Sequence, residues 1–548
     1  MGAGRTIATG LAIVLQTLFA WLLFSGLEAP LLWHDEADTA MFGRRILDYG
    51  YPKVHGPVNT TYGVQHPLEV GSVAGLDAYV GSPWGQYYFA APAVAWSDGA
   101  DGFAARTWRM RVPFVLAGWC GVLLLGVVGA AGWRRLGASV PLFWCGYGVA
   151  LMANVSLQLH LREVRYYPLV VLALGLVAAL ELRRHASPSQ GAPRPATLVL
   201  AGVLWLLFNL FYPAYAAVTL AAGAIYALRA LPEPGWVARL RRFGAEAGPY
   251  LVAGLAVLPM ALFYQIPQQS QAFLTAFRGE GHAWWPRFLD GGAYLLRYEW
   301  WAVAIVGVGW AAWGHLRRGG PDAATRPVLA GCGSVLLVVA VWWALVARTP
   351  FFYERYYVAL SPLLACVGVL AAGLLWQQRS AASARVAGGV LAVLCLFSLH
   401  ARTPDLAGRW SGMGERYRGP LDVAVRFVAD LPPQERPLVV STNYEDHSFM
   451  FYLGAKAVLG FYAPDRVGDR AVLPDVIIPR PWAKNQKALI DQARRASFEA
   501  HELPVANLKA NNVPSLSERN QAKLVHRFVS PPPDAGFGPL RIYVRQEP

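Results

Sequence analysis

Long apolar runs constrain this chain more than any other feature of its sequence. A helix needs roughly 20 mostly apolar residues to cross about 30 Å of hydrocarbon. Lipid offers no hydrogen-bond partner to an open backbone, so each such run must be helical. Eleven stretches qualify: 7–27, 110–132, 138–158, 166–182, 196–212, 213–230, 248–266, 299–316, 327–347, 357–377 and 386–401. We therefore predict a polytopic α-helical membrane protein with about 11 transmembrane helices.

The charge balance supports a membrane protein over a soluble one. Lys and Arg number 48 against 34 Asp and Glu, a net charge of +14, yet only 15% of residues are charged and 55% are hydrophobic. Soluble domains average about 25% charged residues. A nucleic-acid binder needs a polar surface with clustered Lys and Arg, whereas these residues stand between apolar runs. We therefore expect no nucleic-acid partner.

Arginines set the expected orientation of the spans. Every even-numbered span is followed by arginine, and positively charged short loops stay in the cytoplasm. The loop arginines are 134, 135, 183, 184, 229, 239, 241, 242, 317, 318, 379 and 385. The amino terminus then lies in the cytoplasm and, because eleven is odd, the carboxyl-terminal tail lies outside. The predominance of arginine suits a multi-pass protein of a prokaryotic plasma (inner) membrane.

Two regions outside the spans are large. Residues 1–401 are expected to form the transmembrane domain, including a first outer loop at 28–109, and residues 402–548 an extracytoplasmic α/β domain. In that tail the residue pattern predicts strands at 437–441, 458–462, 476–479, 524–529 and 540–544, and helices at 446–453 and 483–500. Residues 84–96 are too short for a confident span and suit a helix that lies on the membrane or re-enters it.

Three carboxylates follow the first span, in Trp33-His34-Asp35-Glu36-Ala37-Asp38. A carboxylate close to hydrocarbon is costly and therefore a candidate for function, and partial burial beside another acid favours a proton acceptor. Asp35 and Glu36 could instead hold a divalent cation, but no His or Cys ligand set accompanies them, so we expect no metal and no cofactor. In the structural alternative, Asp35 caps a helix over 36–47.

Two segments that both contain Arg-Tyr-Tyr lie at the same predicted outer boundary. Arginine there can grip a phosphate with two donors, and tyrosine adds a hydroxyl donor and an interfacial anchor. The structural alternative is an arginine that snorkels beside Glu163 or Glu354 in an aromatic belt. The candidate donor-phosphate and lipid ligands are Arg165, Tyr166, Arg355, Tyr356, Arg162, His160 and Arg348, and the substrate-loop candidates are His66, Tyr87 and His282.

The first loop resembles a known family. The stretch 33–40 with Arg44, Arg45 and Gly50, then Ser82 to Tyr88 and Gly102 to Arg106, is similar to the first-loop signature of C-superfamily integral-membrane glycosyltransferases. The branch of protein O-mannosyltransferases and lipid A aminoarabinose transferase is the most similar. The tail segment from Asn443 to Gly454 also resembles the outer domain of these enzymes. Ser82-Pro83-Trp84 replaces the family's Lys-containing turn, so the resemblance carries over neither donor sugar nor acceptor.

The resemblance implies an activity. Family members take a sugar from a polyprenyl-phosphate carrier and transfer it, usually with inversion, at the outer membrane face to a glycan, lipid or protein acceptor. A family aspartate that matches Asp35 acts on the acceptor hydroxyl, with Glu36 as its expected supporting partner. Transfer of an oligosaccharide or another lipid-linked group is the alternative. A transporter is a further one, although it would prefer charges near the bilayer midplane.

Overall fold

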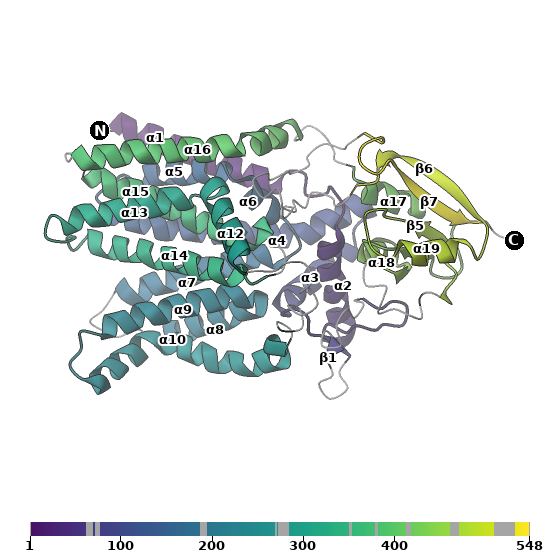
Figure 1. The fold of residues 1–548 in the computed structure, drawn as a ribbon, viewed down its shortest axis with the longest axis horizontal. Coiled ribbons are helices and arrows are strands. Elements are labelled where there is room, and N and C mark those ends of the chain that lie inside the picture. Colours follow the sequence, from purple (N-terminus) through teal and green to yellow (C-terminus); the bar gives the residue numbers. More distant parts are fainter. Residues whose placement is uncertain are drawn as a thin grey trace.

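The computed structural model describes residues 2–61, 70–71, 77–186, 194–268, 271, 284–349, 353–378, 382–412, 418–460, 469, 471–508 and 532–546. Within these ranges a bundle of helices is followed by a five-stranded sheet (Figure 1). The amino terminus lies at the end of the bundle that is far from the sheet (Figure 1). The cytoplasmic and extracytoplasmic sides stay a prediction, as do the boundaries of the two domains.

A helix lies at each of the eleven stretches predicted to span. They are α1 (Gly2–Phe24), α4 (Gly102–Arg135), α5 (Val140–Met152), α7 (Tyr166–Ala186), α8 (Arg194–Leu210), α9 (Tyr212–Ala230), α10 (Trp236–Phe263), α13 (Trp301–Leu316), α14 (Thr325–Val346), α15 (Ser361–Gln377) and α16 (Ala382–Gly412). Seven helical segments of the described chain, within α1, α4, α7, α10, α14, α15 with the turn before it, and α16, are long and apolar enough to cross a membrane. Helices α5, α8 and α13 are shorter but apolar. The membrane-helical fold class is therefore confirmed, while the count of eleven spans stays a prediction.

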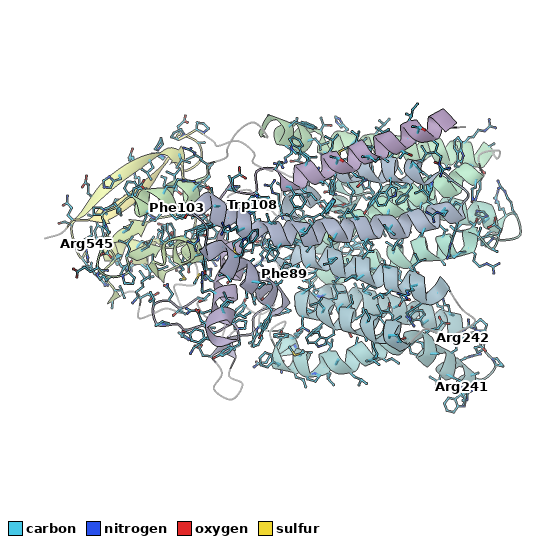
Figure 2. All side chains as sticks on the ribbon, turned by 180° about the vertical axis from the view of Figure 1, so that it is seen from behind. Phe89, Phe103, Trp108, Arg241, Arg242 and Arg545 are labelled. Atoms are coloured by element: carbon cyan, nitrogen blue, oxygen red, sulfur yellow. The ribbon has the colours of Figure 1, made fainter. Side chains whose placement is uncertain are left out.

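The outer surface of the bundle carries large apolar side chains. Leu198, Leu255 and Leu262 are 64, 75 and 65% exposed. Large apolar side chains that are exposed to this degree along helices of a bundle suit contact with lipid. Arg241 and Arg242, in the first part of α10, lie at the opposite end of the molecule from Arg545 in the sheet domain (Figure 2). This arrangement agrees with the charge asymmetry read from the sequence.

Close packing of α4 on α7 fixes one side of the site described below. At Gly121 of α4 a side-chain Cβ would lie 2.5 Å from the backbone nitrogen of Leu172 in α7. Only glycine allows helix backbones to approach so closely, as at other membrane helix interfaces. Helix α7 begins directly after Arg165, so this contact also helps to position that arginine.

Between the bundle and the sheet lie the elements of the first outer loop (Figure 1). Helix α2 (His34–Tyr49) ends at Gly50, whose φ of 81° is left-handed, a conformation that glycine adopts without strain. Helix α3 (Gly85–Asp98) packs against α2 and α4. It corresponds to the predicted short helix at 84–96 and is not among the helices long enough to cross. Strands β1 (Val70–Gly71) and β2 (Ala78–Tyr79) pair in the same region.

Shorter helical elements close the same side of the bundle. These are α6 (Val155–His160), α12 (Trp284–Tyr298) and two short 3-10 turns, Glu354–Tyr356 and Val358–Leu360. They connect neighbouring bundle helices: α6 follows α5, and the 3-10 turns precede α15. Arg165 therefore ends the connection before α7, whose first residues are Tyr166 and Tyr167, and the second Arg-Tyr-Tyr segment lies in the connection before α15.

The tail forms the predicted α/β unit. Its elements are α17 (Pro420–Ala429), β3 (Val439–Thr442), α18 (Asp446–Leu453), β4 (Lys456–Leu459), β5 (Val476–Ile478), α19 (Gln486–Ala493), β6 (Phe498–Ala506) and β7 (Pro539–Arg545). The strand order is β4-β3-β5-β7-β6. Strand β3 is parallel to both neighbours, and β7 is antiparallel to β5 and β6. The predicted strand at 524–529 lies outside the described residues.

One tail prediction is wrong at its end. The helix expected over 483–500 stops at Ala493, and Phe498 already begins β6. Strand β6 pairs with β7 over the register Phe498 to Arg545 through Ala506 to Pro539. That partner lies some 40 residues away in the chain, so local periodicity could not reveal the strand; pairing with a distant strand overrides local preference.

Candidate active site

The first turn of α2 presents Asp35 to two arginines. The Asp35 side chain is 24% exposed, and its Oδ2 lies 3.3 Å from Nη1 of Arg355 and 3.8 Å from Nη2 of Arg165. The helix begins at His34, after Trp33. Asp35 therefore lies inside the helix, and the alternative that it caps a helix over 36–47 is wrong. The partial exposure leaves the carboxylate within reach of a substrate.

Glu36 faces the protein interior instead. Its carboxylate is fully buried, forms an ion pair with Arg111, and accepts hydrogen bonds from Arg111 at 2.5 and 2.9 Å. It also accepts from the backbone N–H groups of Val164, at 3.0 Å, and Trp33, at 3.4 Å. Successive helical residues point about 100° apart, which explains why neighbouring acids have such different surroundings. Glu36 ties the start of α2 to α4 and to the segment before α7, and it touches the site only through the backbone.

Each of the two arginines beside Asp35 has a buried N–H group without a hydrogen-bond partner in the described chain. Arg165 donates to the backbone oxygen of Asp35, at 3.0 Å, and to Thr39, at 3.2 Å. Yet Nε of Arg165 and Nε of Arg355 are buried and have no hydrogen-bond partner among the described residues, and Nη1 of Arg355 meets Asp35 as an ion pair without hydrogen-bond geometry. Buried N–H groups are nearly always paired, so unused guanidinium donors around a half-open carboxylate point to an anionic ligand.

The two acids on this face have opposite pKa shifts. Burial tends to raise the pKa of Asp35, but Arg165 and Arg355 outweigh it and hold this pKa below its ordinary value. For Asp38, burial together with the charges of Asp35 and Asp446 raises the pKa to about 8 despite Arg165. At neutral pH Asp35 is therefore ionised and Asp38 mostly protonated. The two arginines then face one carboxylate, which leaves net positive charge for a phosphate.

His160 joins the two Arg-Tyr-Tyr segments. Its buried ring lies between two carboxylates, with Nδ1 at 3.0 Å from Glu163 and Nε2 at 2.9 Å from Glu354. Burial tends to lower the pKa of His160, but the two glutamates outweigh this and raise it to about 9. Glu163 and Glu354 stand two residues and one residue before the site arginines, so this bridge sets the spacing between Arg165 and Arg355.

The predicted tyrosines form an aromatic wall beside the arginines. Tyr166 stacks on Phe211 with ring centroids 4.8 Å apart, and the Tyr356 ring lies 6.5 Å from the same phenylalanine. Tyr87 is buried near Asp38 and Arg165, where its hydroxyl bonds Ser82 at 2.7 Å and its ring packs on Phe42. Tyr166 and Tyr356 therefore lie beside the arginines, and Tyr87 lies close enough to Asp38 and Arg165 to interact with their charges.

The remaining predicted ligands do not join this cluster. Arg162 is buried and donates to the backbone oxygen of Gly26 at 2.5 Å, which holds the end of α1. Arg348 is exposed and forms no ion pair with the described residues. His66 and His282 lie outside the described residues.

One group of side chains could hold a metal ion. Ligand atoms of His34, Asp446 and His447 all lie within 4.8 Å of one another, and all three residues are buried. The His34 ring stacks on His447, with centroids 4.9 Å apart, and on Tyr444, at 5.1 Å. Imidazole and carboxylate are ligands that suit several divalent cations. The Asp35–Glu36 pair is less suited to bind a metal ion, because each carboxylate already forms an ion pair with an arginine.

Sequence reasoning missed several residues of this site. Arg111, the partner of Glu36, lies inside the predicted span 110–132, and a charge within a span is itself a signal of function. His34 was visible beside Asp35, but its partners Asp446 and His447 come from α18, more than 400 residues later. Nothing in the local sequence connects these positions.

Comparison with known proteins bears on the fold. No protein-family model matches the chain, and no curated protein sequence matches it. Among solved structures, apo ArnT from Cupriavidus metallidurans is similar at 15% identity, over 90% of this chain and 95% of that chain, with a TM-score of 0.50. ArnT from the same organism bound to undecaprenyl phosphate gives 13% identity, 99% and 98% coverage, and a TM-score of 0.48.

The oligosaccharyltransferase of Archaeoglobus fulgidus, in complex with Zn and sulfate, is more distant. It gives 11% identity over 91% of this chain and 72% of that chain, with a TM-score of 0.45. Among these likenesses we use only that to apo ArnT, whose TM-score reaches 0.50. At 15% identity it shows that the two chains share a fold. The fold expected from the first-loop resemblance is thus confirmed: the chain shares its overall fold with ArnT, a membrane glycosyltransferase of the C superfamily.

Proposed function

We propose that this protein is a glycosyltransferase that moves a sugar from a polyprenyl-phosphate donor to an acceptor hydroxyl at the outer face of a prokaryotic plasma membrane. One observation carries the proposal. A half-open carboxylate, Asp35, lies within 4 Å of two guanidinium groups that retain unused donors. This is the minimum set for the reaction: a base for the acceptor and a cationic clamp for the leaving phosphate.

The proposed chemistry is a single displacement. Asp35 accepts the proton of the acceptor hydroxyl as that oxygen attacks the anomeric carbon of the donor sugar. The bond between the anomeric carbon and the phosphate oxygen breaks, and its electron pair leaves on the polyprenyl phosphate. One displacement inverts the anomeric centre. Arg165 and Arg355 stabilise the charge that develops on the leaving phosphate.

We further propose that binding of the donor phosphate raises the pKa of Asp35. In the free protein the two arginines lower the pKa of Asp35. A donor phosphate bound to them would take up part of their positive charge, and the pKa of Asp35 would then rise. A base with a pKa closer to neutral accepts a proton more readily. The donor would therefore activate the carboxylate that deprotonates the acceptor.

A second candidate function is metal-assisted transfer of an oligosaccharide or another lipid-linked group. The group formed by His34, Asp446 and His447, directly beside Asp35, favours it. Activity that a chelator abolishes and Mn²⁺ or Zn²⁺ restores supports this candidate. Full activity in the presence of the chelator supports the metal-free reaction.

The decisive experiment is genetic and chemical. The gene is deleted, and surface glycans, lipids and glycoproteins are compared by mass spectrometry, with complementation by the wild-type gene or by Asp35→Asn. We expect one sugar to be missing after deletion, restored by the wild type and not by Asp35→Asn. An unchanged set of glycoconjugates, or full restoration by Asp35→Asn, contradicts the proposal.

A further inference from the structure

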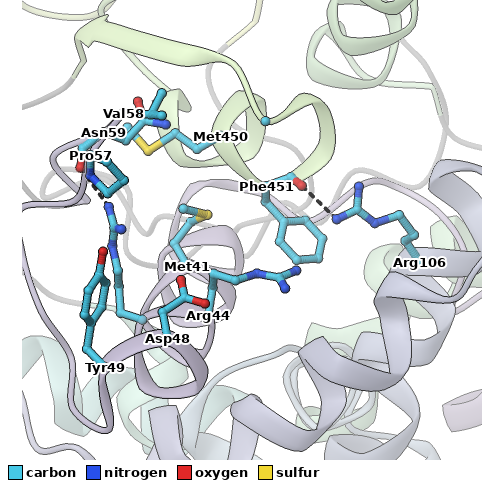
Figure 3. Close-up of a pocket in the computed structure, with 12 residues that line it drawn as sticks. Met41, Arg44, Asp48, Tyr49, Pro57, Val58, Asn59, Arg106, Met450 and Phe451 are labelled. Carbon is cyan, nitrogen blue, oxygen red and sulfur yellow. Dashed lines mark hydrogen bonds between the residues drawn. The ribbon is translucent and has the colours of Figure 1, made fainter. Parts of the chain in front are cut away.

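Helices α2 and α18 run side by side from the candidate active site toward a cavity. His34 of α2 stacks on His447 of α18 at one end. Farther along both helices, Met41 and Arg45 of α2 line the same cavity as Met450 and Phe451 of α18. The two helices therefore start together at the site and border the cavity together. Figure 3 shows Met41, Arg44 and Asp48 on one side of this cavity and Met450 and Phe451 on the other.

The cavity is large and basic. Its volume is about 400 Å³, and its lining includes Arg44, Arg45 and Arg106 against one acid, Asp48. Ligand pockets in proteins typically hold about 300–1,000 Å³. Arg44 pairs with Asp98 outside the lining, through both of its terminal nitrogens. The other two arginines leave a positive charge at the cavity wall.

Arg45 and Arg106 are held mainly by neutral partners. Arg45 is 5% exposed and donates to the Thr61 hydroxyl, at 2.9 Å, and to the Asn59 backbone oxygen, at 2.7 Å. It forms no ion pair with the described residues. Arg106 donates to two backbone oxygens of α18, with Asp98 only at 3.9 Å, and its buried Nε has no hydrogen-bond partner in the described chain.

Such charges are costly without a counter-ion. A buried cation is normally paired or drawn toward a ligand, and burial lowers the pKa of both Arg45 and Arg106. Neutral partners orient the two guanidinium groups, and the charges of nearby carboxylates, Asp48 and Asp77 for Arg45 and Asp98 for Arg106, do not outweigh the cost of burial. A cavity of ligand size between them supplies the place for an anion.

We propose that this cavity binds an anionic group, a phosphate or a carboxylate, of the acceptor while the acceptor hydroxyl lies at Asp35. The inference rests on the proposed function and assigns its acceptor class. Ten residues of helix separate Asp35 from Arg45, a rise of about 15 Å. The acceptor is therefore an extended anionic glycan or glycolipid head rather than a single neutral sugar.

Val58 provides a test that removes no polar contact. Its side chain lines the cavity and is 40% exposed. Val58→Glu places a carboxylate at the rim, and Val58→Gln is the matched neutral control. Arg106→Gln removes one proposed ligand, and Arg109→Gln, one helical turn on, controls for loss of charge outside the cavity.

Binding is measured on the full-length protein in detergent, by thermal shift at constant ionic strength. The probes are inorganic phosphate and glucuronate, with glucose as the neutral counterpart of glucuronate. We expect at least one anion, but not glucose, to bind the wild type, Val58→Gln and Arg109→Gln. Arg355→Gln should keep the component of anion binding that Val58→Glu loses. The affinity should fall at least about tenfold in Val58→Glu and Arg106→Gln, the scale of one charge-assisted contact.

Several results overturn the inference. Equal binding by Val58→Glu and Arg106→Gln places the anion elsewhere, as does a loss seen only in Arg355→Gln. Binding of neither anion to the wild type removes the basis of the proposal. Once an acceptor is known, Val58→Glu must raise the KM for the acceptor and not for the donor. If the anion binds the cavity but no sugar transfer is found, the proposed function fails while the binding site stands.

Discussion

Replacing Asp35 by Asn tests the proposed base most directly. The substitution keeps the size of the side chain and removes one negative charge near Arg355 and Arg165, at 3.3 and 3.8 Å. At an effective dielectric constant of about 20, these distances correspond to gross attractions of about 5 and 4 kcal/mol. Much of this attraction offsets the cost of burial, which is why we expect the fold to survive. Its loss leaves two arginines with more free charge for the donor phosphate.

The kinetic consequence is a split between turnover and donor binding. General base catalysis typically contributes about 10²–10⁴-fold, or about 3–5 kcal/mol of barrier. We therefore expect kcat of Asp35→Asn to fall by that factor, while the Kd for the lipid-linked donor stays equal or decreases. The assay is transfer of a radiolabelled sugar by the detergent-purified protein, with donor binding measured separately.

Asp38→Asn is the matched control, because it makes the same chemical change one helical turn away. With the pKa of Asp38 at about 8, this substitution removes little charge at pH 7, and kcat should remain within a few-fold of the wild type. A kcat for Asp35→Asn within about tenfold of the wild type would refute the assigned base. Equal losses in both variants would refute the distinction between the two acids.

Three further outcomes follow from the site. Arg355→Gln removes charge-assisted contacts worth about 1.5–3 kcal/mol, so the donor Kd should rise about 10- to 150-fold in a binding assay; an unchanged Kd contradicts its role. Glu36→Gln leaves the buried Arg111 unpaired and should lower stability by about 3–5 kcal/mol, read as an earlier thermal unfolding transition, whereas an unchanged transition shows that the pair is dispensable. Since the folded-state pKa of His160 is about 9, its protonation stabilises the protein fully below about pH 6.5, and this stabilisation disappears as pH rises through 9. His160→Gln should flatten the thermal stability profile between pH 6.5 and 9.5, and an identical slope in both proteins contradicts the bridge.

The sequence could predict the helices because each apolar run must satisfy its own backbone in lipid. It also predicts that Asp35, Arg165 and Arg355 lie at one boundary of the membrane, since each follows the end of a span predicted to run outward. Both arginines lie within 4 Å of the Asp35 carboxylate. These distances depend on the packing of three segments that are far apart in the sequence. No local pattern encodes the His160 bridge that sets this spacing.

Adjacent acids are hard to tell apart by sequence alone. Asp35 and Glu36 look like one motif, yet Glu36 belongs to a buried ion pair with Arg111. The arginine inside the span 110–132 was the available signal that an acid nearby needed a structural partner. The metal-capable group is different, because Asp446 and His447 come from a helix whose position depends on the folding of the whole tail.

Contacts at the start of the first outer loop have a consequence for the order of assembly during synthesis. The backbone N–H groups of Leu31 and Leu32, just before α2, donate to Asp422 at 3.0 Å and to the Tyr452 hydroxyl at 2.9 Å. Ser448 donates to the backbone oxygen of Leu32 at 2.9 Å. The segment that carries Asp35 therefore acquires its final supports only after the ribosome has made residue 452. A nascent chain with every bundle helix in place would still lack these supports until residues 422 to 452 had been made.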